Sequence, residues 1–240
     1  MDEIPLVKSQ LTQRGWLAGA SHAVPIVMGY IPIGLAFGVL AQKAGLSALN
    51  TLLMSLLVYA GSAQLIAVGL FGVGAPPLSI ILTTFVVNLR HLLMSAAVAP
   101  HLRRWRKLEL AAFAHELTDE TFAVHAARFV SESPRQAQVF GTNTTSQAAW
   151  ILGTGLGVLM GQVIADVKPL GLDYALPAMF VALLVIQIKD RVQIAVAVLT
   201  GAASVILLLG GVSRWHVIVA TLIGATLGVI LEQWIKKPSS

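Results

Sequence analysis

Continuous apolar runs separated by short polar connections dominate the chain. The runs lie at 17–40, 48–71, 78–99, 146–164, 173–188, 192–210 and 214–235. Runs of this length cross ~30 Å of hydrocarbon as α-helices. Because apolar and polar residues do not alternate within them, the pattern excludes a transmembrane β-barrel. The sequence therefore predicts an all-α, polytopic membrane helical bundle with about seven transmembrane helices, forming a single integral membrane domain over residues 1–240.

The composition agrees with a membrane protein. The chain has 240 residues, of which 56% are apolar and 11% charged, and its mean hydropathy is +0.80. Soluble domains carry about 25% charged residues, so a soluble enzyme is excluded. The absence of cysteine excludes disulfide scaffolds, thiolate zinc centres and cysteine nucleophiles. The net charge of +5 is carried by the connections and indicates topology rather than a nucleic-acid partner.

Residues 108–130 have a helical pattern but carry Glu116, Asp119 and Glu120 near their centre. If this segment spans the membrane, there are eight helices, and eight and seven basic residues lie on the two sides. If it does not span, eleven lie on one side and four on the other, as the positive-inside rule requires. We therefore expect seven spans, an amphipathic or re-entrant acidic helix, an outside N-terminus and a cytoplasmic C-terminus.

The eleven residues are Lys43, Arg103, Arg104, Arg106, Lys107, Arg128, Arg135, Lys189, Arg191, Lys236 and Lys237, and the four are Lys8, Arg14, Lys168 and Arg214.

One basic residue lies inside an apolar run. Arg90 stands near the middle of 78–99, two residues after Asn88 and next to His91. Asn88 and His91 share one helix face, and Arg90 points about 120° away from it. A charged residue at this depth costs roughly 2.5–3.5 kcal/mol on insertion scales. We therefore expect Arg90 to have a carboxylate partner or to bind a substrate carboxylate.

The acidic segment supplies the carboxylates for this partnership, with Asp119 the first choice and Glu120 the second. On a continuous helix, His115 shares a face with Asp119, and Glu116 shares another with Glu120. Crowding of like charges raises at least one carboxyl pKa, which suits a proton-coupled carrier. The alternative is that these side chains form a solvated face.

The first run contains two prolines seven residues apart, Pro25 and Pro32, with Gly29 and Tyr30 between them. Each proline removes a backbone donor and crowds the preceding turn. We expect this helix to be kinked or unwound near Gly29 to Pro32 and to line the substrate path, as discontinuous helices do in many secondary transporters.

The second run centres on the segment YAGSAQ, which contains Tyr59, Ser62 and Gln64. Its small residues favour close helix packing, and Gln64 provides a hydrogen-bonding group within an apolar run. These three residues are candidate substrate-binding residues.

Signatures of enzymes and nucleotide-driven pumps are missing. The segment HELTD has an aspartate where the zinc-protease motif needs its second histidine, and no Walker A loop, nucleophile elbow or dinucleotide fingerprint occurs. We therefore expect no enzymatic activity, no metal and no cofactor. Transport by this chain must use a gradient or a separate subunit.

Five segments together, PIVMGYIPIGLAFG, YAGSAQ, NLRHLL, LTDETFA and LPAMF, carry a family resemblance. In this order and spacing the chain resembles the AzlC family, the large subunit of bacterial branched-chain amino acid exporters (the LIV-E group), over about residues 20–190. The resemblance implies export of leucine, isoleucine and valine across the bacterial inner membrane, with methionine as a further candidate. It also implies coupling to protons and a small four-helix partner resembling AzlD.

A branched aliphatic zwitterion needs an anion-binding group, a cation-binding group and an apolar pocket. Backbone near Gly29 to Pro32, together with Asn88 and Gln64, is the expected site for the zwitterionic head. Arg90 and Asp119 are the expected switchable pair. The alternatives are an ion-conducting channel or pore-forming subunit, and an assembly subunit without a substrate of its own.

Overall fold

The computed structural model describes residues 5–131, 133, 135–164, 166–174, 177–178, 181–182, 184–185, 188, 190–212 and 216–235. All regular elements among them are helices, which confirms the all-α prediction. In the described part of the chain, three helices are long and apolar enough to cross a membrane: Val24–Lys43, Pro77–Leu102 and Arg191–Leu209. The chain is thus a helical membrane bundle, whereas the seven spans remain a prediction. Of the run 173–188, residues 175–176, 179–180, 183 and 186–187 lie outside the described residues.

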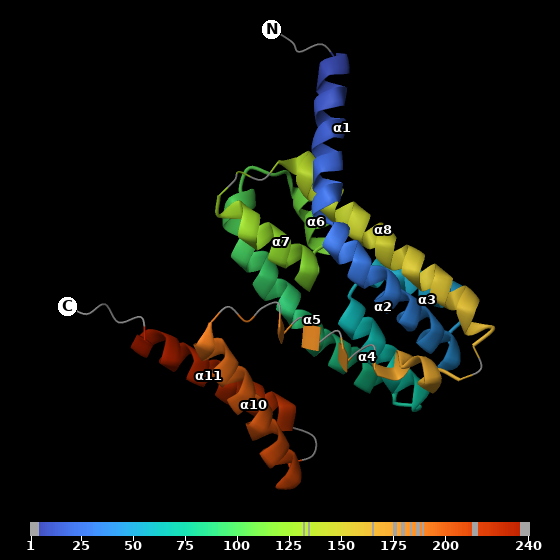
Figure 1. Cartoon of the computed structure of the whole chain (residues 1–240), viewed down its shortest axis with the longest axis vertical. Coiled ribbons are helices and arrows are strands. Elements are labelled where there is room, and N and C mark those ends of the chain that lie inside the picture. Colours follow the sequence, from blue (N-terminus) through green and yellow to red (C-terminus); the bar gives the residue numbers. More distant parts are fainter. Residues whose placement is uncertain are drawn as a thin grey trace. The chain divides into compact units, whose positions relative to one another are not determined.

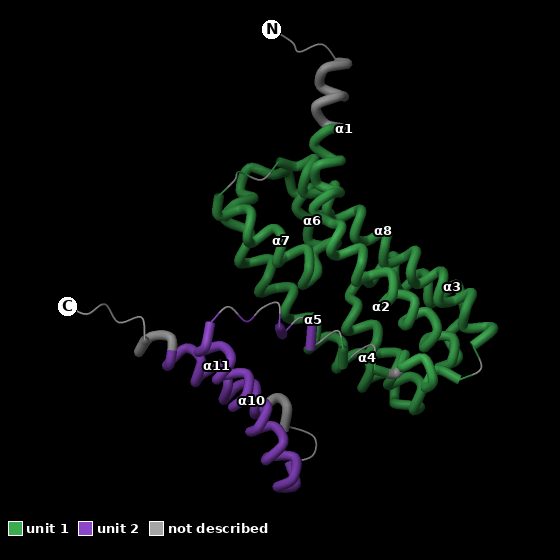
Figure 2. The backbone as a smooth tube through the Cα atoms, viewed as in Figure 1, with its two compact units in different colours: residues 1–180 green, residues 181–240 purple. Residues whose placement is uncertain are grey.

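The chain divides into two compact units, residues 1–180 and 181–240 (Figure 2). Within the second unit, α10 (Arg191–Leu209) packs along α11 (His216–Ile235) as a helical hairpin. The Asp190 carboxylate caps α10 by accepting a hydrogen bond from the Gln193 amide at 2.8 Å. The first unit holds all the candidate site residues that the sequence singles out.

The centre of the first unit is the pair α2 (Val24–Lys43) and α8 (Gln136–Gly161), and α1 (Pro5–His22) packs on the first part of α8 (Figure 1). Glycines bring the backbones of α2 and α8 into contact. A Cβ placed on Gly153 would lie 2.6 Å from the Ile31 carbonyl oxygen, and one on Gly34 would lie 2.9 Å from the Trp150 carbonyl oxygen. Close approach through small residues is a usual way for membrane helices to associate.

The first run is predicted to be kinked or unwound near Gly29 to Pro32, and the helix is not unwound there. The helix α2 continues through Gly29 and Pro32 to Lys43, and the chain turns earlier, at Ala23, between α1 and α2. Pro25 occupies the first turn of α2, where a missing amide donor costs nothing. Pro32 removes one hydrogen bond and stands on the exposed side of the helix, so the remaining ladder keeps α2 continuous.

The second run is the one that breaks. It forms α3 (Ala48–Leu53), a π-helical turn η1 (Met54–Val58) and α4 (Gly61–Gly72). Between η1 and α4, Tyr59 has φ 43° and ψ 47°, the left-handed region that non-glycine residues rarely occupy. Such strained backbone in the middle of a membrane run is typical of functional sites.

The third run forms α5 (Pro77–Val98), which tightens at its end into the 3-10 turn η2 (Ala99–Leu102). Pro77 lies in the first turn of α5, where it is compatible with helix initiation. Further along the chain, the short 3-10 turns η3 (Lys168–Leu170) and η4 (Leu172–Tyr174) follow α8.

The acidic segment forms two short helices, α6 (Lys107–His115) and α7 (Asp119–Phe129). They contain 9 and 11 residues, so they are only about 14 and 17 Å long, and neither crosses a bilayer by itself. This agrees with the prediction that the segment is not one spanning helix. The connection is not solvated: Leu117 and Thr118 are buried. The chain therefore places the ends of two helices inside the unit.

The sequence around Thr118 explains why a second helix begins there. The Thr118 hydroxyl accepts a hydrogen bond from the Thr121 amide, and the Thr121 hydroxyl accepts one from the Thr118 amide at 2.8 Å. Asp119 and Glu120 then occupy the first turn, where negative charge complements the helix dipole. This reciprocal cap separates residues that a continuous helix would have aligned on one face.

Candidate functional site

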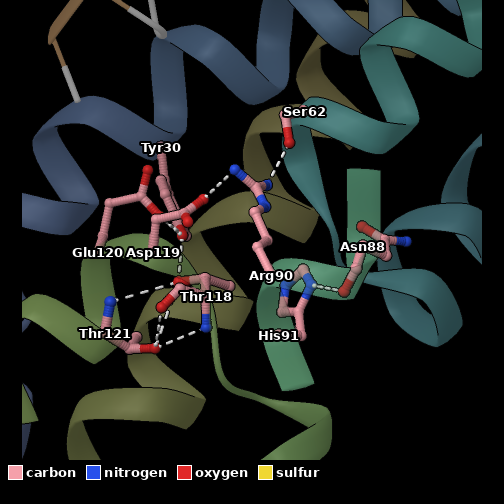
Figure 3. A network of polar contacts seen from close by, with 9 residues as sticks. All are labelled: Tyr30, Ser62, Asn88, Arg90, His91, Thr118, Asp119, Glu120 and Thr121. Carbon is pink, nitrogen blue, oxygen red and sulfur yellow. Dashed lines mark hydrogen bonds and ion pairs between the residues drawn. The ribbon is translucent and has the colours of Figure 1, made fainter. Parts of the chain in front are cut away.

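A polar pocket lies where the two helix breaks meet α2, α5 and α8 (Figure 3). Its lining combines opposite charges, hydroxyl groups and aromatic rings. The lining residues are Tyr30, Tyr59, Ala60, Gly61, Ser62, Arg90, His91, Thr118, Asp119, Glu120 and Trp150. Seven of the fourteen site residues expected from sequence line this pocket, and the other seven do not. The seven that line it are Tyr30, Tyr59, Ser62, His91, Arg90, Asp119 and Glu120.

An ion pair stands at the centre of this pocket. Arg90 Nη1 lies 2.7 Å from Asp119 Oδ2, which is the pairing that the sequence predicts. The second terminal nitrogen of Arg90 donates a hydrogen bond to the Ser62 hydroxyl, and Nε is buried without a partner. The two charged side chains are 26% and 17% exposed, so they are accessible to a small ligand while screened from bulk water.

A second carboxylate lies beside this pair. The Tyr30 hydroxyl donates to Glu120 Oε2 at 2.6 Å and lies 2.7 Å from Thr118 Oγ1. Burial raises the pKa of Glu120, while the bond from Tyr30 opposes that rise by stabilising the ionised form. The pocket therefore holds one guanidinium and two carboxyl groups within a single network.

Aromatic rings form the wall behind the charges. The Trp150 ring packs edge-on against Tyr30, with centroids 5.3 Å apart, and Tyr59 packs edge-on against Tyr30 at 6.4 Å. Trp150 and Tyr59 are almost completely buried, with 1% and 2% exposure. An aliphatic side chain placed against these rings would lose contact with water.

Gln64 acts behind this wall and does not line the pocket. Its Oε1 accepts a hydrogen bond from Trp150 Nε1 at 3.1 Å, and its Nε2 donates to Ser55 Oγ at 3.3 Å. Ser55 Oγ lies 2.8 Å from Thr154 Oγ1. These bonds tie the residues on both sides of the Tyr59 break to α8. The expectation that Gln64 holds substrate is therefore corrected: both ends of its amide are already used within the protein.

Other expected site residues lie elsewhere. His115 is exposed at the end of α6 and does not share a face with Asp119, because the cap at Thr118 interrupts the helix. Asn88 is outside the pocket lining, although its carbonyl oxygen lies 3.2 Å from Nδ1 of the pocket residue His91. Glu116 is buried on the far side of the break and faces Asn143 rather than Arg90.

The three α2 positions Pro25, Gly29 and Pro32 also stay outside the pocket, and both prolines are exposed. Of the α2 candidates only Tyr30 enters it, because the unbroken helix turns that residue toward α7 while carrying the prolines away.

Four lining residues are not among the site residues expected from sequence: Ala60, Gly61, Thr118 and Trp150. Thr118 carries a recognisable signal, since a threonine followed by two acidic residues is a helix-start signature, and that signature would also have located the break. Trp150 reads as an interfacial tryptophan at the edge of the run 146–164. The longer helix α8 instead places it in the interior, and no local pattern distinguishes the two positions.

The fold and the site define a multi-pass helical membrane protein with a charged pocket where two interrupted segments meet. The AzlC protein family model matches residues 25–164, and the chain belongs to this family. This range contains the complete pocket lining.

Several relatives extend the similarity beyond that range. The inner membrane protein YgaZ of Escherichia coli is 29% identical over 222 residues, covering 90% of this chain and 88% of the relative. A membrane protein of Archaeoglobus fulgidus is 34% identical, covering 92% and 96%. The branched-chain amino acid transport protein AzlC of Bacillus subtilis is 24% identical, covering 76% and 74%. No solved structure matches the chain.

Proposed function

We propose that this chain is a secondary active transporter subunit that exports branched-chain amino acids. Leucine, isoleucine and valine are the proposed substrates, with methionine a further candidate. The name of the Bacillus subtilis relative supports the substrate class. The observation that carries the proposal is the Arg90–Asp119 pair, held beside Glu120 where two interrupted segments meet. The proposed function is movement of the amino acid without a chemical step.

The substrate carboxylate binds Arg90, in competition with Asp119. The N-terminal end of α4 supports this contact, because the first amides of a helix have no acceptor within the helix and carry partial positive charge. Ser62, in the first turn of α4, already contacts the Arg90 guanidinium. Helix ends of this kind bind the charged groups of substrates in other secondary transporters.

The substrate ammonium group binds the carboxylates on the opposite side of the pocket. When the substrate carboxylate takes Arg90, Asp119 loses its partner and becomes available to the ammonium group, with Glu120 adjacent. The aliphatic side chain packs on the aromatic wall of Trp150 and Tyr59. A zwitterion therefore replaces one internal ion pair with two, which avoids leaving an uncompensated charge in the membrane.

Proton uptake by a carboxyl group of the α6–α7 segment drives export, and a small four-helix subunit resembling AzlD completes the transporter. Burial supports the first part, because it raises the pKa of Glu120 and so favours the protonated carboxyl group. The family resemblance supports the second.

Counterflow of labelled leucine in proteoliposomes tests this function. The chain is reconstituted alone and with any small subunit that co-purifies with it, and the vesicles are preloaded with unlabelled leucine. We expect labelled leucine to accumulate transiently, and lysine to be excluded by its second cationic group. An ion channel would give flux that follows conductance without counterflow, and an assembly subunit would leave all activity with its partner. Either result contradicts the proposal.

A further inference from the structure

A second group of buried polar residues lies outside the pocket, on the other side of the break that ends α6. Glu116 is 8% exposed, and its Oε2 has no hydrogen-bond partner. Among the described residues, no basic side chain forms an ion pair with it. An unpaired carboxyl group in this position is costly when ionised, so it favours binding a proton.

Asn143 connects Glu116 with a buried histidine. Asn143 Oδ1 lies 2.7 Å from His125 Nε2, so the neutral histidine donates to the amide oxygen. This bond turns the amide nitrogen of Asn143 toward Glu116, where it favours the ionised carboxylate. The nitrogen itself completes no hydrogen bond. His125 therefore determines which end of the Asn143 side-chain amide faces Glu116.

His125 is itself held in place and kept neutral. It is 2% exposed, stacks on Phe129 with centroids 5.3 Å apart, and packs against Phe113 at 5.5 Å. Burial lowers the pKa of His125, and the charges of Arg128 and His22 lower it further. A neutral imidazole fixed in this way keeps one N–H directed at Asn143.

Glu116 is also connected to the substrate pocket. It is close enough to interact electrostatically with the Tyr59 hydroxyl, and that hydroxyl is buried without a hydrogen-bond partner. Tyr59 lines the pocket at the strained break before α4. Further along the chain, the Thr121 hydroxyl lies 3.4 Å from the Glu116 carbonyl oxygen. The charge on Glu116 therefore acts on the break at Tyr59, and the Glu116 backbone is tied to the cap that begins α7.

We propose that Glu116 is the proton-binding carboxyl of the transport cycle, and that His125 is a positioning residue that sets its proton affinity through Asn143. The inference rests on the proposed function and assigns a separate role to the Arg90–Asp119 pair. Asp119 is compensated by Arg90, so its protonation would leave the guanidinium alone in the membrane. Glu116 gains and loses a proton at its own oxygen without breaking an ion pair.

Two transport measurements on the full chain separate the roles. Leucine counterflow at equal pH on both sides measures substrate exchange, and leucine accumulation under an imposed pH gradient measures proton coupling. For E116Q, we expect counterflow within about 2-fold of the wild type and gradient-driven accumulation reduced at least 10-fold. The control is E109Q, which removes the same charge from α6 at a carboxylate that bonds to Gln136 and the Arg106 amide. It should retain both activities.

The pH profile of accumulation tests the positioning role. H125L removes the donor, so the Asn143 amide is free to turn its oxygen toward Glu116, which stabilises the protonated carboxyl. The midpoint of the profile should move to higher pH by roughly one pH unit. H125Q, whose amide places an N–H near the original Nε2, should restore the wild-type midpoint. A loss of folding alone would lower the amplitude without moving the midpoint.

The outcomes distinguish this inference from the proposed function. Absence of leucine counterflow in the wild type refutes the proposed function and the inference with it. Wild-type counterflow combined with gradient-driven accumulation by E116Q within 2-fold of the wild type overturns the assignment of Glu116 alone. Identical midpoints for H125L, H125Q and the wild type overturn the role of His125.

Discussion

Removing Arg90 and Asp119 together should lower the free energy of unfolding by less than the sum of the two separate removals. Two unit charges about 4 Å apart interact by about 4 kcal/mol at an effective dielectric constant of 20. Their nitrogen and oxygen atoms are 2.7 Å apart, but the side chains are 26% and 17% exposed. Solvent screening reduces the interaction, and we expect a coupling free energy of about 2 kcal/mol, or roughly 30-fold in an equilibrium constant.

A double-mutant cycle measures this coupling. Arg90→Ala, Asp119→Ala and the double variant are purified in the same detergent, and the free energy of unfolding is taken from denaturant titration. Each single variant leaves one charge uncompensated, whereas the double variant removes both, so the double should recover part of the lost stability. It should not recover transport, because it lacks both groups proposed to bind the zwitterion. Arg90→Lys should transport poorly, since an ammonium group lacks the planar fork of donors.

A matched cycle with Glu109→Ala in place of Asp119→Ala provides the control. The hydrogen bonds of Glu109 go to the Arg106 amide and to Gln136 rather than to Arg90, so the effect of its removal should add to that of Arg90→Ala. Additive losses within about 0.5 kcal/mol in the Arg90–Asp119 cycle would refute the reasoning. Arg90 would then be assigned to the substrate carboxylate alone.

Three further predictions follow from other parts of the first unit. Reporter fusions after residues 107 and 135 should both report the cytoplasm; opposite locations would establish that the acidic segment crosses the membrane. Gly153→Ala should destabilise the protein by about 1–3 kcal/mol because its Cβ meets a backbone carbonyl of α2, whereas Gly29→Ala, with nothing within 4 Å, should be tolerated in the same unfolding assay. Burial raises the pKa of Glu116 to about 7, above its ordinary value near 4.3, so its protonated form stabilises the fold at low pH and that contribution is lost as pH rises through 7. Glu116→Gln should therefore raise the melting temperature at pH 8 and leave it nearly unchanged at pH 4, and an equal effect at both values would contradict the assignment.

The Arg90–Asp119 pair is the part of the site that the sequence predicts. A lone guanidinium in an apolar run requires an anionic partner, and the acidic segment was the available source, so the pairing was predictable without coordinates. The break in that segment was missed, although the helix-start signature at Thr118 is present in the sequence. A continuous helix was expected to align His115 with Asp119, but the Thr118 cap ends one helix and starts another, leaving His115 exposed.

The break at Tyr59, in contrast, was not predicted from the sequence. Prolines indicate positions where a helix loses one hydrogen bond, and Pro25 and Pro32 directed the prediction to the first run. Whether a helix breaks there depends on whether neighbouring elements compensate the lost bond, which is a property of packing. Tyr59, which carries no breaker signal, instead adopts a left-handed conformation because Gln64, Ser55 and α8 hold both sides of the break.

The sequence by itself determined that the chain lies in a lipid bilayer, that it is all-α, which family it resembles and that Arg90 needs an anionic partner. These properties follow from transfer free energies summed along the chain and from the high cost of an uncompensated charge in hydrocarbon. The tertiary structure decided which polar residues share a pocket. It brought Thr118 and Trp150 to the Arg90–Asp119 pair and placed Glu116 beside Asn143, because contacts between distant segments set the direction of each buried side chain, and no local pattern records them.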